Sequence, residues 1–71
     1  MNRIHQKQLK NFAQTVKTLR SNKNYTQEDL AARLDIDVRT VKRIESGDYN
    51  PSLVSMMEIA DALGVTLKDL L

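Results

Sequence analysis

The sequence predicts an all-α fold, a compact bundle of five short helices. Apolar residues recur at spacings of three and four in several segments, as they do along one face of a helix. Glycine and proline occur only at Gly47, Gly64 and Pro51, so the segments between them can run without interruption. Residues that commonly cap helix N-termini stand before most of these segments.

Length and composition limit the possible functions. The 71 residues suffice for one small domain, and we treat residues 1–71 as one. The absence of cysteine excludes disulfides, and a single histidine, His5, argues against a metal site. No segment approaches the roughly 20 apolar residues of a membrane span, and the basic start lacks a signal-peptide core. We therefore expect a cytoplasmic protein with no metal, cofactor, membrane partner or small-molecule substrate.

The first predicted helix carries one apolar stripe. Its members follow the helical period and are Leu9, Phe12, Ala13, Val16 and Leu19. Residues 1–6 either extend this helix or form a loose arm. The pattern breaks between Ser21 and Tyr25.

The second helix has a sharp predicted start. Thr26 and Asp29 have the spacing of a capping box, and the apolar positions that follow extend to about Leu34. Asp35 stands where the chain must turn, and aspartate tolerates the left-handed conformation better than most residues. Ile36, in the turn, is expected to fill the corner between this helix and the next.

The third helix is expected to cross the second closely. Asp37 is its predicted N-cap and Gly47 marks its end. Val41 and Ile44 form its inward side, and the small side chain of Ala31 allows the two helices to approach. Two short helices joined by a tight turn form a helix-turn-helix, in which the second helix enters the DNA major groove.

Two further helices complete the predicted bundle. Ser52 caps the fourth, which ends before Gly64, and Thr66 with Asp69 begins the fifth. The apolar stripe of the fourth helix consists of Leu53, Met56, Met57, Ala60 and Leu63.

Charge is distributed unevenly along the chain. Residues 1–25 carry six basic side chains and no acid, whereas residues 26–71 carry five basic and nine acidic side chains. The second part nevertheless contains a basic cluster of Arg39, Lys42 and Arg43. This asymmetry fits a face that binds a polyanion, and it equally fits a solvated basic helix, so charge alone leaves both interpretations open.

A family resemblance adds to these observations. The stretch YTQEDLAARLDIDVRTVKRIESGDYNPS resembles the helix-turn-helix of phage repressors and Cro proteins, the Xre family. VKTLR before it resembles the family's first helix, and MEIADALGVTLKDLL resembles its fourth and fifth. The likeness covers roughly residues 9–71 and implies a lambda-repressor-like fold, with the helix-turn-helix at the second and third helices.

The resemblance implies specific DNA contacts. The positions that match base-contacting residues of the family are Val38, Arg39 and Arg43. Arginine pairs with O6 and N7 of guanine, and each good contact discriminates by about 1–3 kcal/mol. Val38 fits a thymine methyl contact, but its spacing from Val41 also fits a core position.

Phosphate contacts are expected around the same helix. Gln27 matches a family position that contacts phosphate, and free amides at a helix N-terminus support this role, although it also fits an ordinary polar first-turn residue. The remaining expected phosphate contacts are Thr40, Lys42, Ser46 and Asn50. The family counterparts of Arg20 and Glu45 form an ion pair, so we expect both to be structural.

Three acids depart from the family pattern. Asp35 stands where glycine is usual, Asp37 brings negative charge close to the DNA backbone, and Asp48 lies in the phosphate-facing loop. These acids predict weaker non-specific DNA binding than in a more basic relative.

We therefore predict a sequence-specific regulator of transcription, a repressor that binds double-stranded operator DNA as a homodimer. Leu67, Leu70 and Leu71 are candidates to bury against a second copy, and the alternative is that Leu70 and Leu71 fold back onto the first helix. An enzyme is not expected, because His5 has no visible catalytic partner and no glycine-rich phosphate loop is present. The alternative is a helical module that uses the same fold to bind a protein.

Overall fold

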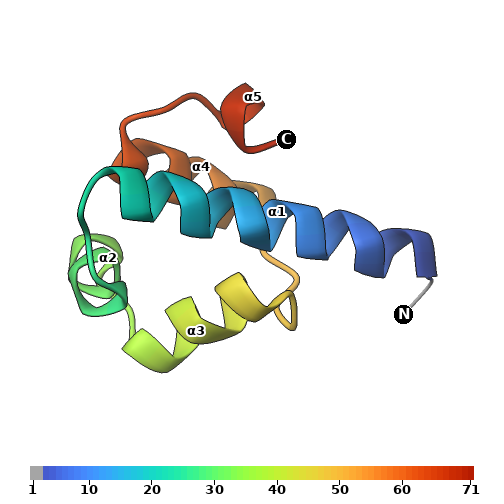
Figure 1. Ribbon diagram of the computed structural model, residues 1–71, viewed down its shortest axis with the longest axis horizontal. Helices are drawn as coiled ribbons and strands as arrows, with labels where there is room; N and C mark the ends of the chain where they lie inside the picture. The colour runs from blue at the N-terminus through green and yellow to red at the C-terminus, as the bar shows by residue number, and fades with distance from the viewer. Residues whose placement is uncertain (1–2) are drawn as a thin grey trace.

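The computed structural model describes residues 3–71, which form five helices (Figure 1). They are α1 (Arg3–Asn22), α2 (Gln27–Leu34), α3 (Val38–Ser46), α4 (Leu53–Leu63) and α5 (Leu67–Leu70). The predicted all-α bundle of five helices is confirmed. Residues 3–6 belong to α1, while residues 1–2 of the predicted extension or arm lie outside the described part of the chain. No helix within residues 3–71 is both long and apolar enough to cross a membrane.

The long helix α1 runs through the middle of the molecule, in front of α4, with α3 on one side and α5 on the other (Figure 1). It packs against α3, α4 and α5, and its N-terminal end projects beyond the bundle. The side chains of Val16, Val41 and Leu63, from three different helices, are fully buried. The helices thus share one core, and its burial is the main source of stability in a domain that lacks disulfides.

The turn between α2 and α3 follows from its capping residues. Thr26 and Asp29 form the predicted capping box, in which each side chain accepts a hydrogen bond from the other's backbone N–H. Asp35 ends α2 in the left-handed conformation, with φ 56°. Asp37 then accepts a hydrogen bond from the backbone N–H of Arg39 and so caps α3.

The packing of α2 on α3 is as expected, except at the corner. Ala31, Val41 and Ile44 are all buried in the same cluster. Ile36 does not fill the corner, since 36% of it remains exposed. It lies just after the left-handed residue Asp35, and its side chain borders a shallow hollow instead of entering the core.

The last leucines were predicted either to bury against a second copy or to fold back onto α1, and the structure separates Leu70 from Leu71. Leu70 is 2% exposed and belongs to the core of its own chain, where α5 packs against α1 and α4. Leu71 remains 82% exposed. Leu70 therefore folds back onto α1, and it offers no surface to a second copy.

An ion pair ties the end of α1 to the end of α3. Nε and Nη2 of Arg20 donate to the two carboxylate oxygens of Glu45, at 2.7 and 3.1 Å. Nη1 of Arg20 donates to the carbonyl oxygen of Tyr25 at 2.7 Å, and Nε2 of Gln27 donates to Glu45 at 3.1 Å. The side chain of Glu45 is only 3% exposed, and its hydrogen bond raises the pKa of Arg20. The expected ion pair is present, and the hydrogen bond from Gln27 to Glu45 connects it to the start of α2.

Gly47 allows α3 to end against α1. Its φ of 84° favours glycine, and a Cβ there would lie 3.0 Å from Cγ and 3.4 Å from Cα of Lys10. Gly64 has a similar φ of 69°, but a Cβ there would approach only Nζ of Lys23, the free end of a flexible side chain. The close atom at Gly47 is instead Cγ of Lys10, which lies next to the backbone of α1 and has less freedom to move away.

Gly47→Ala should therefore destabilise the protein more than Gly64→Ala. Both variants place alanine in the left-handed region, which costs about 1–2 kcal/mol. Gly47→Ala should cost about 1 kcal/mol more, because Cγ of Lys10, unlike the free end of Lys23, cannot easily move away from the added methyl group. Urea unfolding followed by circular dichroism measures both values, and equal losses would contradict the close approach of α1 and α3.

Arg20→Met should lower the free energy of unfolding by about 3 kcal/mol, because it leaves the buried carboxylate of Glu45 without its cation. The double variant Arg20→Met/Glu45→Met should be more stable than this single variant, since no uncompensated charge remains. The same unfolding measurement tests this order. A double variant less stable than Arg20→Met would show that Glu45 stabilises the fold without Arg20.

Candidate nucleic-acid interface

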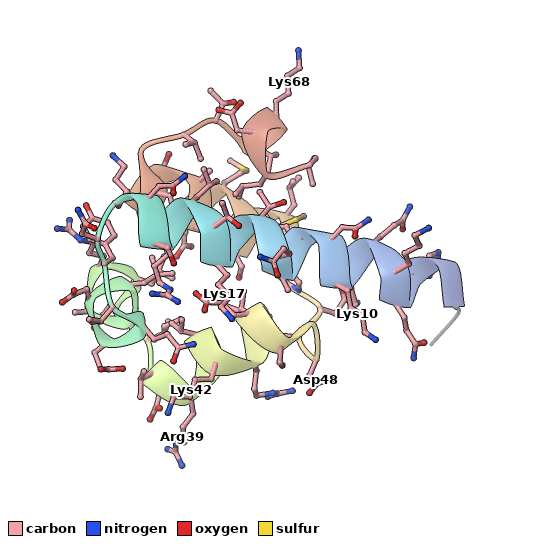
Figure 2. All side chains as sticks on the ribbon, viewed as in Figure 1. Lys10, Lys17, Arg39, Lys42, Asp48 and Lys68 are labelled. Carbon is pink, nitrogen blue, oxygen red and sulfur yellow. The ribbon has the colours of Figure 1, made fainter. Side chains whose placement is uncertain are left out.

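Helix α3 has one apolar face and one basic face. Val41 and Ile44 are buried beneath it, whereas Arg39, Lys42 and Arg43 are exposed on the opposite side. Figure 2 shows Arg39 and Lys42 at the outer edge of the molecule, away from α1. The helical period separates the two sets, so burial of one presents the other to solvent.

Arg39 is held by the residue that caps its own helix. Its Nε donates to Oδ1 of Asp37 at 3.1 Å, and its Nη2 donates to Oδ2 at 2.9 Å. These side-chain hydrogen bonds lower the pKa of Asp37 to about 2, and the hydrogen bond from the backbone N–H of Arg39 is the second cause. The carboxylate therefore stays ionised at neutral pH, and the pKa of Arg39 is raised in return.

Arg43 lies over an aromatic ring. Its guanidinium carbon is 5.7 Å from the centre of the Tyr49 ring, within the range of a cation–π contact. The Ser46 hydroxyl is 2.9 Å from the carbonyl oxygen of Arg43 and 3.3 Å from a carboxylate oxygen of Asp48. Tyr49, in the loop after α3, thus contacts the guanidinium of Arg43, and Asp48 of the same loop lies close to Ser46.

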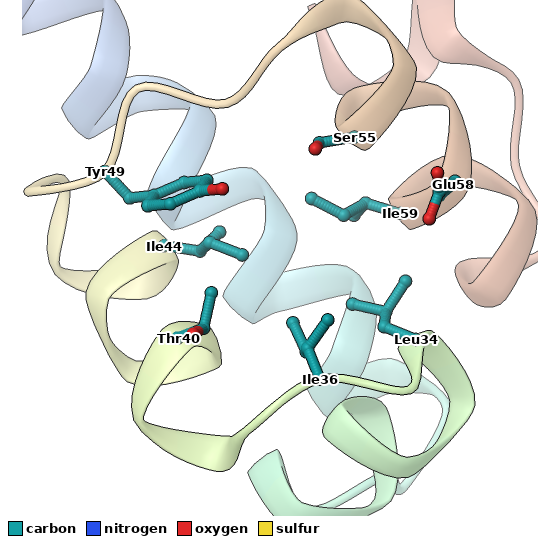
Figure 3. A pocket seen from close by; sticks show the side chains of 8 residues that line it. All are labelled: Leu34, Ile36, Thr40, Ile44, Tyr49, Ser55, Glu58 and Ile59. Carbon is teal, nitrogen blue, oxygen red and sulfur yellow. The ribbon is translucent and has the colours of Figure 1, made fainter.

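Val38 and Thr40 are set apart from the exposed basic face. Val38 is half-buried and packs against the core, although part of it remains accessible at the start of α3. Thr40 is also half-buried and lines a hollow of about 50 Å³ between α2, α3 and α4, where Figure 3 shows it beside Ile44 and Ile36. The predicted phosphate contact by the Thr40 side chain stays a prediction, and only the exposed part of this half-buried residue is available for it.

Two more of the predicted phosphate contacts, Gln27 and Asn50, have different surroundings. Gln27 is half-buried, and its amide already donates to Glu45. Its backbone stands at the first position of α2, where main-chain N–H groups lack helical partners. Asn50 is exposed and borders a hollow with His5, Gln8 and Leu9 of α1. Ser46 is the last residue of α3, and Asn50 belongs to the short loop that follows it.

Two further residues lie near this surface, and one of them, Lys10, was not among the residues expected to contact DNA. Lys10 is exposed, and its side-chain stem passes beside Gly47, so it projects from α1 next to the loop that contains Asp48 (Figure 2). Tyr49 supports Arg43 through its ring. The absence of acids in residues 1–25 indicates basic character for the first helix. Only the packing of α1 on α3 identifies which lysine meets the loop.

The arrangement can bind an anion over an extended surface. Cations from α1 and α3 border one exposed side, and hydroxyl and amide groups of the loop lie beside them. Guanidinium groups suit both phosphate oxygens and the acceptor pair of guanine. Among the described residues, no group of three or more histidine, aspartate or glutamate side chains is placed to hold a metal ion.

Comparisons with known proteins agree with this geometry. The helix-turn-helix family HTH_3 matches residues 16–70. An HTH-type transcriptional regulator of Methanocaldococcus jannaschii is 42% identical over 55 residues, 78% of this chain and 83% of that protein. Control protein C.MunI of Mycoplasma is 40% identical over 60 residues, 83% of this chain and 81% of that protein.

A solved structure shows the same arrangement. The restriction-modification controller protein C.AhdI of Aeromonas hydrophila superposes with a TM-score of 0.85 at 35% identity, over 89% of this chain and 96% of that one. The helix-turn-helix predicted from the sequence is confirmed. The chain belongs to the HTH_3 helix-turn-helix family.

Proposed function

We propose that this protein regulates transcription, as a repressor, by binding a specific operator with α3 in the major groove. The observation that carries the proposal is the pair of exposed arginines, Arg39 and Arg43, on a helix whose opposite face is buried. Because the apolar face of α3 is packed in the core, its exposed face can contact base edges while the core contacts stay in place. The family is one of DNA-binding regulators rather than enzymes, and DNA binding in turn suggests a cytoplasmic location.

Each exposed group has a proposed part in binding. Arg39 and Arg43 contact guanine, and the accessible edge of Val38 contacts a thymine methyl. Lys42 binds phosphate, with Lys10 beside the loop as a further cation.

Polar groups at both ends of the helix-turn-helix complete the contact. We assign phosphate contacts to Ser46, Asn50 and the N-terminus of α2 at Gln27. Main-chain amides and the helix dipole favour an anion at such a terminus. With phosphates held at both ends, α3 is fixed in its register on the duplex.

We further propose that two copies bind DNA side by side through the apolar surface of α4, defined as Leu53, Val54 and Met57. These side chains are 58%, 61% and 47% exposed. A two-fold interface brings the same patch of each copy together, so an uncharged apolar patch is self-complementary where a charged one would repel. The chain measures 31 × 24 × 21 Å, and adjacent copies of that size can present their α3 helices to half-sites about 34 Å apart.

Selection from random duplex DNA tests base reading. The wild type should recover one consistent motif, and Arg39→Ala and Arg43→Ala should each lose the preference at a different guanine, by about 10-fold. Lys42→Ala should keep the motif and reduce the slope of log affinity against log salt by about 1, since one fewer phosphate is neutralised. A wild type that recovers no motif, or binding that salt does not weaken, would instead favour the protein-binding module.

Val54→Asp should abolish dimer formation, because it places two carboxylates in one apolar interface. Sedimentation equilibrium on a duplex with two half-sites should show two wild-type copies bound cooperatively and the variant bound without cooperativity. Leu71→Asp is the matched control, since it makes the same change at a residue outside α4. A dimer lost in Leu71→Asp and kept in Val54→Asp would move the interface to the chain end.

A further inference from the structure

Asp37 makes more contacts than an N-cap requires. Its Oδ1 accepts the backbone N–H of Arg39 at 2.8 Å, which completes the cap of α3. The same oxygen accepts Nε of Arg39, and Oδ2 accepts Nη2. One carboxylate therefore fixes both the first turn of the helix and the guanidinium that projects from it.

The hydrogen bonds to Asp37 occupy only one edge of the Arg39 guanidinium. An arginine side chain has five N–H groups in a planar fork, and Asp37 engages two of them, one on Nε and one on Nη2. The end-on edge, formed by Nη1 and the second N–H of Nη2, makes no contact with Asp37. The Arg39 side chain is 84% exposed, so this edge faces solvent. Two parallel N–H groups match the O6 and N7 acceptors of guanine.

We infer that Asp37 is a positioning residue that holds the Arg39 guanidinium with its end-on edge directed at a guanine, and so sets the base preference at that position. The inference rests on the proposed function, since it assigns the way in which one of the base-reading side chains is oriented. Asp37 lies at the start of α3, the part of a recognition helix that enters the groove first. A guanidinium already held there has less rotamer freedom to lose on binding.

The negative charge of Asp37 supports this role rather than opposing it. A carboxylate close to the phosphates weakens binding to every sequence, including non-operator DNA. Because it also accepts hydrogen bonds from the side edge of Arg39, that edge is less free to turn to a phosphate or to another base. Asp37 therefore lowers non-specific affinity and keeps the arginine for a base with two acceptors.

Asp48 provides a matched control. It is an exposed aspartate in the loop after α3, but it contacts the Ser46 hydroxyl and makes no ion pair with Arg39. Asp37→Asn and Asp48→Asn change the net charge equally. Asparagine also caps helices well, so Asp37→Asn should keep α3 intact, which thermal unfolding checks.

The experiment compares two duplexes. One carries the motif selected by the wild type, and the other carries a substitution at the guanine whose preference is lost in Arg39→Ala. The ratio of the two dissociation constants should fall about 2- to 10-fold in Asp37→Asn, the factor expected when one side chain must be ordered on binding. It should stay at the wild-type value in Asp48→Asn, and both variants should bind non-operator DNA more tightly.

Nuclear magnetic resonance of the Arg39 side chain tests directly whether Asp37 holds its guanidinium. The Nε–H signal of Arg39 in the free protein should exchange with solvent more slowly in the wild type and in Asp48→Asn than in Asp37→Asn. A ratio that is unchanged or raised in Asp37→Asn overturns the inference, and a raised ratio would mean that Asp37 holds Arg39 away from DNA. Absence of any preferred motif in the wild type overturns the proposed function itself, which separates the two failures.

Discussion

The ion pair of Arg20 and Glu45 is the constraint on which the placement of the other functional elements depends. It joins α1 to the end of α3, and the hydrogen bonds of Arg20 to Tyr25 and of Gln27 to Glu45 add the start of α2. Three helices are thereby fixed at one point. Because Glu45 is almost fully buried, the pair has little freedom to rearrange, and α3 keeps a defined angle to its neighbours.

That fixed angle separates the two faces of α3. Its apolar side completes the core, and its basic side is left for a partner. Each arginine on the basic side has a local support, Asp37 for Arg39 and the Tyr49 ring for Arg43. Side chains ordered before binding lose less entropy on binding, so the supports favour a small number of well-defined base contacts over many weak ones.

Most of the fold could be predicted from the sequence because its signals are local. The capping box at Thr26, the left-handed Asp35 and the glycine ends of α3 and α4 each depend on a few neighbouring residues. Ile36 was placed wrongly, because a corner is filled or left open by the relative positions of two helices. The half-burial of Thr40 was likewise not visible in the sequence, since it depends on which neighbouring helix packs beside that residue.

The sequence by itself determined the class of protein, the helix-turn-helix and the basic character of α3, because helical period, caps and motif order are properties of the linear chain. Only the tertiary structure decided that Leu70 belongs to the core, that Lys10 meets the loop after α3, and that Gln27 is bound to Glu45. These contacts join residues far apart in sequence. Their geometry depends on how the helices pack, and no short segment of the chain contains that information.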